Sequence, residues 1–221
     1  MRSEASSRKL VFLSHSHKDV ELANSAKEHL EWRFAINLFV AHEDLTPSEE
    51  WQTEILRMLR KCDAFIPLLT RNFARSNWTD QETGLALAFK KLIIPIRVDV
   101  NPYGFVGKLQ ALRWDRTDIT SGVNKLAQVL FQKHILSTDE LIRCLRRSRN
   151  YDDAGFKAKV LRDADGLSRR QINEIAHAAI QNEQVHGASS AKTPLRTLFQ
   201  QHSHSIDRQT KKALKRLSLM N

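Results

Sequence analysis

Four runs of apolar residues, mostly branched or aromatic, recur along the first hundred positions at nearly constant intervals. They begin at Leu10, Ile36, Ala64 and Leu92, so their starts are 26, 28 and 28 residues apart. Each run has the length of a buried strand, and the segments between the first three have the apolar period of helices. Strands that alternate with helices of this length form right-handed crossovers and a parallel sheet covered on both faces. The sequence therefore predicts an α/β fold.

A fifth strand is expected around residues 111–114, followed by a helix over about 121–134. Two prolines, Pro67 and Pro95, lie inside the third and fourth predicted strands, and neither has an N–H to donate to the sheet. Each therefore requires a strand end or an irregularity in the sheet at its position.

The alternation stops after the fifth strand and its helix, and the pattern then becomes helix after helix. Ser168 and Gln171 have the spacing of a capping box, and an apolar stripe of helical period follows them. We expect a first domain over residues 8–137 and a small all-α domain over 138–221, with an internal loop at 187–190.

The composition is typical of a globular protein. Hydrophobic residues make up 41% of the 221 positions and charged residues 27%. The sequence has neither the long apolar run of a membrane span nor the core of a signal peptide, so we expect a cytoplasmic protein. The two cysteines belong to no ligand pattern, which argues against a disulfide framework and against a zinc site.

The net charge of +10 is concentrated in the C-terminal third. Residues 138–221 hold 16 basic and 9 acidic side chains, net +7, whereas residues 1–137 hold 19 and 16, net +3. This asymmetry fits a polyanionic partner or a solvated helical surface. Residues 166–179 fit a helix-turn-helix but equally a generic pair of helices, and the basic residues follow no single helical phase. We therefore expect a partner protein for 138–221, and not nucleic acid.

Polar residues follow the first three predicted strands, where ligands bind in a parallel sheet. Ser14 and His15 follow the first strand, a loop with Asp44 follows the second, and residues 70–78 follow the third. No glycine follows the first strand, which excludes the glycine-rich phosphate loops of dinucleotide-binding and P-loop proteins.

The helix after the third strand places a carboxylate beside an indole. Ser76 or Asn77 can cap this helix, and Trp78 and Glu82 are four residues apart, so they are neighbours on one face. The rest of that face is apolar, so the carboxylate is placed against an indole on a half-buried stripe. On these residues alone, the simpler interpretation is that Glu82 stabilises the positive end of its helix, and the alternative is a carboxylate with a function. Trp51, on the preceding helix, suits a core position as well as a pocket wall.

These motifs together resemble a bacterial TIR (Toll/interleukin-1 receptor) domain. In chain order they are the strand ending in Ser14 and His15 with Asp19 after it, the loop 43–47 with Trp51, the stretch 71–78, and Glu82. The resemblance covers about residues 8–135 and implies a five-stranded parallel sheet with the flavodoxin-like strand order 2-1-3-4-5. The loop departs from many bacterial relatives because no glycine stands beside Pro47.

The resemblance implies an enzyme that cleaves the nicotinamide–ribose bond of NAD⁺, with Glu82 as the catalytic glutamate. One carboxylate suffices for this reaction, because nicotinamide leaves as a neutral molecule and positive charge develops on the ribose. The residues expected to bind the substrate are Ser14, His15, Asp44, Ser76 and Trp78. NAD⁺ is then a substrate, and neither a cofactor nor a metal is expected.

The resemblance further implies homo-oligomers formed through TIR–TIR contacts and a role in antiphage defence signalling. The residues leave open whether NAD⁺ is depleted or converted into a cyclic ADP-ribose signal. Two other functions also remain open. One is a non-catalytic adaptor that acts by homotypic association, and the other is a secreted effector that interferes with a host's TIR signalling.

Overall fold

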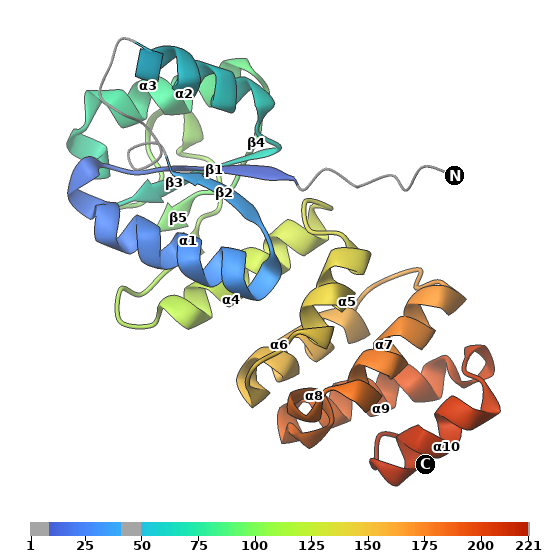
Figure 1. The fold of residues 1–221 in the computed structure, drawn as a ribbon. Helices are drawn as coiled ribbons and strands as arrows, with labels where there is room; N and C mark the ends of the chain where they lie inside the picture. Colours follow the sequence, from blue (N-terminus) through green and yellow to red (C-terminus); the bar gives the residue numbers. More distant parts are fainter. Residues whose placement is uncertain (1–8, 41–49, 221) are drawn as a thin grey trace. The chain divides into compact units, whose positions relative to one another are not determined.

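The computed structural model describes residues 9–40 and 50–220, and the contacts divide the chain into two units, Met1–Ile135 and Leu136–Asn221. This division falls close to the domain boundary expected at 137. Figure 1 shows that the first unit combines a sheet with helices and that the second is helical. Each unit has its own buried apolar core.

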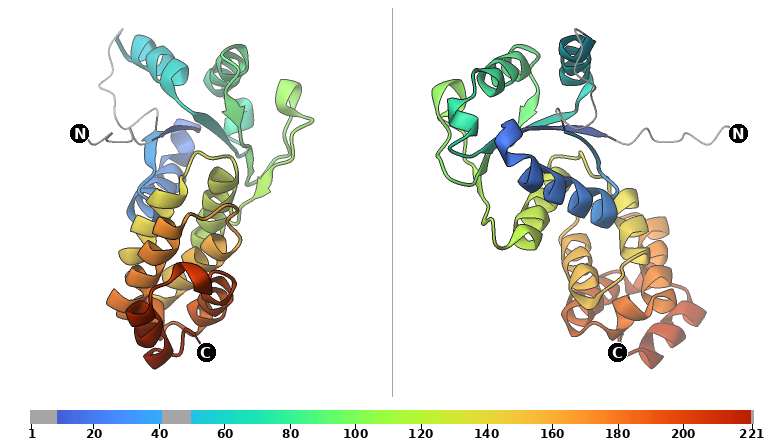
Figure 2. Two further views of the ribbon diagram at one scale, coloured as in Figure 1. Left: turned by 90° about the vertical axis from the view of Figure 1, so that its right-hand side faces the viewer. Right: turned by 60° about the vertical axis from the view of Figure 1, so that its left-hand side comes forward.

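The first unit alternates strands and helices as the apolar runs predicted. Its elements are β1 (Leu10–Ser14), α1 (Val20–Phe34), β2 (Asn37–Val40), α2 (Glu50–Lys61), β3 (Ala64–Leu69), α3 (Asn77–Ala88), β4 (Leu92–Ile93), β5 (Ile96–Arg97), β6 (Leu112–Arg113) and α4 (Ile119–Gln132). Helices α1 and α4 lie on one face of the sheet and α2 and α3 on the other, and the turned views agree (Figures 1 and 2). The predicted α/β class is confirmed.

The strands of the sheet are parallel and follow the order β2-β1-β3-β5-β6, with β4 also beside β3. One predicted strand, the run from Leu92, is divided into β4 and β5, so the sheet has six strands, and the predicted order 2-1-3-4-5 holds when these two segments are counted as one. On the side of β4 and β5, the pairing of β3 stops after Phe65 and resumes at Leu68, and Pro67 and Pro95 lie in this gap. Because neither proline can donate a hydrogen bond, the break occurs where both donors are missing.

Three phenylalanines form the centre of the core beneath α2 and α3. The ring centroid of Phe12 lies 5.2 Å from that of Phe39 and 5.7 Å from that of Phe65, which joins three neighbouring strands. Ile55 and Leu59 of α2 are buried against this cluster, as the helical period predicted. This cluster holds α2 and α3 against the sheet.

The second unit consists of six helices in the described residues. They are α5 (Thr138–Arg146), α6 (Tyr151–Arg162), α7 (Arg169–Gln181), α8 (Glu183–Gly187), α9 (Ser189–Gln201) and α10 (Arg208–Arg216). The predicted capping box is confirmed, since the Ser168 side chain accepts from the backbone of Gln171 and the Gln171 side chain accepts from the backbone of Ser168. None of the described helices is long and apolar enough to cross a membrane.

The loop expected at residues 187–190 is instead the junction between two helices. Helix α8 ends at Gly187, and α9 begins at Ser189 after a single residue, the buried Ala188. The start of α9 packs closely against α6, since a Cβ atom at Gly155 would lie only 2.1 Å from Ser190 Oγ.

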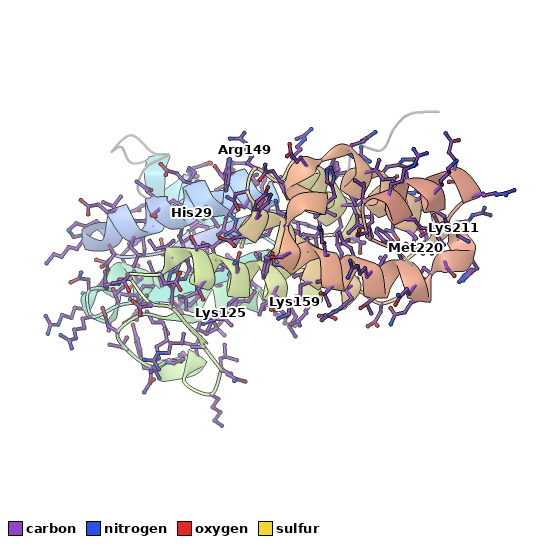
Figure 3. All side chains as sticks on the ribbon, turned by 90° about the horizontal axis from the view of Figure 1, so that it is seen from below. His29, Lys125, Arg149, Lys159, Lys211 and Met220 are labelled. Carbon is purple, nitrogen blue, oxygen red and sulfur yellow. The ribbon has the colours of Figure 1, made fainter. Side chains whose placement is uncertain are left out.

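The five basic residues of α10 share one face of the helix. They are Arg208, Lys211, Lys212, Lys215 and Arg216; Lys211 is labelled in Figure 3. At about 100° per residue they span an arc of about 140°, and the buried Thr210 and Leu214 lie on the opposite side. The expectation that basic residues follow no single helical phase is therefore wrong for α10.

Candidate active site

The carboxyl end of β1 delivers two buried polar residues to the edge of the sheet. Ser14 is the last residue of β1, in register with Pro67 of β3, and is completely buried. His15 follows with only 1% of its surface exposed. Both lie at the edge where ligands bind in open parallel sheets, as their position after the first apolar run predicted.

Helix α3 brings Glu82 to the same place. The helix begins after Ser76, whose hydroxyl accepts a 3.5 Å hydrogen bond from the backbone N–H of Thr79. Glu82 lies in the second turn and is 1% exposed. Its Oε2 accepts a short hydrogen bond from Ser14 Oγ, and its Oε1 accepts one of 2.9 Å from Trp78 Nε1. The Glu82 carboxylate thus accepts one hydrogen bond from β1 and one from its own helix.

Burial dominates the electrostatics of Glu82. Loss of solvent raises the pKa of this carboxyl to about 7, although the hydrogen bonds from Ser14 and Trp78 act in the opposite direction. No cation in the described part of the chain forms an ion pair with Glu82. The group therefore changes its charge near neutral pH, and perturbed pKa values of this kind cluster at functional sites.

The other predicted site residues have different surroundings. Trp78 is half-buried and packs against the phenylalanine cluster, so its indole both covers Glu82 and donates to it. The prediction that Ser76 or Asn77 caps α3 is confirmed for Ser76. Asp44 and the side chain of Trp51 lie outside the described residues. No group of three or more metal-ligating side chains occurs in the described segments.

A second buried carboxylate at this edge joins four segments of the chain. Asp19, which is 5% exposed, accepts hydrogen bonds of 2.6 Å from Thr70 Oγ1 and 3.1 Å from Asn72 Nδ2. Arg116 lies 3.5 Å from Asp19 and 2.9 Å from Asp99. This network ties the ends of β1, β3 and β5 to the segment before α4.

Sequence reasoning placed Asp19 in a motif but assigned it no role, and it missed Arg116 altogether. The two positions are almost a hundred residues apart, and no local pattern relates them. The only available signal was that each follows a predicted strand at the carboxyl edge.

Comparison with known proteins places the first unit in a family. The model for the TIR domain matches residues 11–130, more than half of the chain. Among solved structures, the chain is similar to the TIR domain of the Toll-related receptor TRR-2 from the lower metazoan Hydra magnipapillata. The two are 21% identical, the match covers 57% of this chain and 93% of that one, and the TM-score is 0.43. No match is found among curated protein sequences. On the match of the family model, the chain belongs to the TIR-domain family.

Proposed function

We propose that this chain is an NAD⁺ nucleosidase that cleaves the bond between nicotinamide and ribose, with Glu82 as the catalytic carboxylate. The observation that carries the proposal is the buried Glu82 side chain, held by Ser14 and Trp78, with a pKa of about 7 and no cation partner among the described residues. A TIR domain that acts only by association has no need for such a group.

The proposed reaction breaks the bond between C1′ of the ribose and the nicotinamide nitrogen. The bonding electron pair leaves with nicotinamide, which becomes neutral, and the ribose becomes a cation that water or a group of the same molecule captures. The Glu82 carboxylate accepts hydrogen bonds from the ribose hydroxyls and stabilises the positive charge. Because Glu82 is almost completely buried, this stabilisation is stronger than in water.

The neighbours of Glu82 have supporting roles in this proposal. Trp78 covers the carboxylate and fixes Oε1 through its N–H, whereas Ser14 holds Oε2 until a ribose hydroxyl takes the place of the serine hydroxyl. His15, Ser76 and Asp44 are proposed to complete the substrate pocket. NAD⁺ is the substrate, and the reaction draws on no cofactor or metal.

The test is incubation of the purified chain with NAD⁺ and chromatography of the products. We expect nicotinamide together with ADP-ribose or a cyclic ADP-ribose, and the second product distinguishes depletion from signal synthesis. Glu82→Gln is the matched variant, since it keeps the shape and removes the charge. Absence of nicotinamide release at every concentration and pH would contradict the proposal and favour the non-catalytic adaptor or the effector.

We further propose that homo-oligomers of this TIR domain complete the site, with the loop 41–49 contributing. Specific activity should then rise with protein concentration. Asp44→Ala should lower it without changing the unfolding curve. Equal turnover per molecule at every dilution would contradict this part of the proposal. The activity fits antiphage defence signalling in the cytoplasm.

The second unit is proposed to recruit or regulate through a partner protein with an acidic segment. Helix α10 supplies five cations and no carboxylate on one face, whereas the rest of the unit is nearly balanced in charge. This stripe is about 12 Å long and offers five cations, whereas proteins whose affinity for duplex DNA depends steeply on salt make about six to ten phosphate contacts. Tight, salt-sensitive binding of DNA or RNA by the full chain would overturn this preference.

A further inference from the structure

The connection from β5 to β6 builds a pocket beside two arginines. It is a folded segment of 14 residues, 98–111, in which Gly107 N–H donates to Gly104 O at 3.1 Å and Leu109 N–H donates to Val106 O at 2.9 Å. Tyr103 Oη donates a 2.8 Å hydrogen bond to Asp80 of α3, which anchors the segment to the rest of the unit. A connection of this length with an ordered fold is typically functional.

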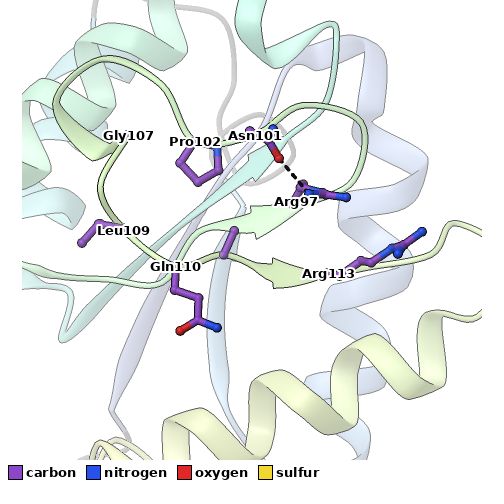
Figure 4. Close-up of a pocket in the computed structure, with 8 residues that line it drawn as sticks. Arg97, Asn101, Pro102, Gly107, Leu109, Gln110 and Arg113 are labelled. Carbon is purple, nitrogen blue, oxygen red and sulfur yellow. Dashed lines mark hydrogen bonds between the residues drawn. The ribbon is translucent and has the colours of Figure 1, made fainter.

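The pocket has a volume of about 550 Å³ and a mixed lining. Pro102, Leu109 and Ala111 provide apolar surface, and Arg97, Arg113 and Gln110 provide hydrogen-bond donors. Figure 4 shows the two arginine side chains leaving neighbouring strands in the same direction, to the right in this view, whereas Pro102 and Leu109 lie to the left of the strand ends. The size suits a small molecule and the lining suits one with both apolar and anionic parts.

The two arginines are a pair of like charges held together by the sheet. Arg97 and Arg113 are the last residues of β5 and β6 and are register partners. Like charges directly opposite one another on neighbouring strands are destabilising. An anion that both guanidinium groups contact would remove this repulsion.

No described carboxylate lies within salt-bridge distance of the pair, and Asp115 attracts Arg113 only weakly. Neither arginine forms an ion pair with a described residue, and the hydrogen bond of Arg97 Nη1 is to a neutral group, Asn101 Oδ1, at 2.8 Å. Asp99 is engaged by Arg116. Asp115 accepts from Thr117, and Arg113 is the weakest of the influences that lower the pKa of that carboxyl.

We propose that this pocket binds a small molecule that carries a diphosphate or phosphate group next to a planar or apolar moiety. Guanidinium groups bind phosphate oxygens through two parallel hydrogen bonds, and two of them match the charge of a diphosphate better than that of a single carboxylate. Asn101 orients the first fork, and Pro102 and Leu109 contact the apolar part. This site is distinct from Glu82 and does not depend on NAD⁺ cleavage.

Calorimetric titration of the full chain with ADP, pyrophosphate and adenosine tests the proposal. We expect ADP to bind most tightly, pyrophosphate more weakly, and adenosine not measurably. The double variant Arg97→Gln/Arg113→Gln should weaken ADP binding by about tenfold or more, as expected for loss of charge-assisted hydrogen bonds. Pyrophosphate binding as tight as that of ADP would overturn the apolar half of the proposal.

The control is Arg60→Gln/Lys125→Gln, which removes the same charge from exposed positions outside the pocket. It should keep ADP affinity within about twofold, because screened surface charges at a distance contribute little. Tryptophan fluorescence verifies that every variant is folded. Unchanged ADP affinity in the pocket variant, equal losses in both double variants, or no ADP binding by the parent chain would overturn the proposal.

Discussion

Replacement of Glu82 by glutamine should weaken catalysis and strengthen the fold at the same time. The carboxyl has a pKa of about 7 in the folded chain and a usual value of 4.5. The folded state therefore keeps its proton to a higher pH than the unfolded chain does. The contribution of Glu82 to the stability of the fold is fully present below pH 4.5, falls as the pH rises from 4.5 through 7, and does not change further above that. The difference between these two pKa values corresponds to about 3 kcal/mol in the free energy of unfolding.

Glutamine is never charged, so the variant escapes this loss. Its amide oxygen can accept from Trp78, and its amide group can donate to Ser14, so both contacts have replacements. We expect Glu82→Gln to unfold with a free energy about 3 kcal/mol higher than the parent at pH 8.5, and less than about 1 kcal/mol higher at pH 5. Catalysis should fall by about 10²–10³, as when a group that stabilises transition-state charge is lost.

Urea unfolding followed by tryptophan fluorescence measures the stability of the correct unit. All four tryptophans lie in the first unit: Trp32, Trp51, Trp78 and Trp114. Glu28→Gln, at an exposed glutamate of α1, is the matched control and should change neither activity nor the pH dependence of unfolding. A Glu82→Gln chain with activity within about threefold of the parent, or with the same stability difference at both pH values, would refute the reasoning.

Three further substitutions test the neighbouring structure. Ser14→Ala removes a donor to the Glu82 carboxylate, so the pH of half-maximal NAD⁺ turnover should move upward and the free energy of unfolding should fall by about 1–3 kcal/mol; an unmoved pH profile would contradict the contact. Asp19→Ala deprives buried donors of their acceptor and should lower the stability of the first unit by about 2–3 kcal/mol in the fluorescence assay, whereas a loss below about 0.5 kcal/mol would show that the network is not stabilising. Lys157 and Asp153 are each 2% exposed, and Lys157 Nζ lies 2.6 Å from Asp153 Oδ2. Lys157→Met should therefore lower the free energy of unfolding of the second unit by about 3–5 kcal/mol, measured by the circular dichroism of its helices, and Asp153→Leu/Lys157→Met should recover most of this loss.

The sequence predicts on which helix or strand each residue of the candidate site lies, but not which of these residues contact one another. Spacing alone places Trp78 and Glu82 on one face of a helix, and apolar runs place Ser14 at the end of a strand. The hydrogen bond between Ser14 and Glu82 joins positions 68 residues apart. It depends on how α3 packs against β1, and no local pattern contains that information.

The same limit explains what the sequence did not reveal elsewhere. Pro67 and Pro95 signalled an irregular sheet, but only the register shows that one strand becomes two at that point. Lys157 lies in a helix that also carries Lys159, and nothing local tells which ammonium is buried. Helix α5 decides this, because the backbone oxygen of Cys144 accepts a 3.0 Å hydrogen bond from Lys157 Nζ.

The two buried carboxylates at the carboxyl edge differ in their partners, and this difference separates structure from proposed function. Asp19 has the Arg116 guanidinium, which it shares with Asp99, at 3.5 Å. Within residues 9–40 and 50–220, the hydrogen-bond donors to Glu82 are the neutral groups of Ser14 and Trp78. A positively charged nicotinamide ring beside Glu82 would favour the ionised carboxyl and lower its pKa. The substrate would thus generate the form of Glu82 that stabilises the ribosyl cation, and departure of neutral nicotinamide would return the carboxyl to its resting pKa once the cation is captured. A permanent cation beside Glu82 would remove this coupling, which explains why an uncompensated buried carboxylate suits this chemistry.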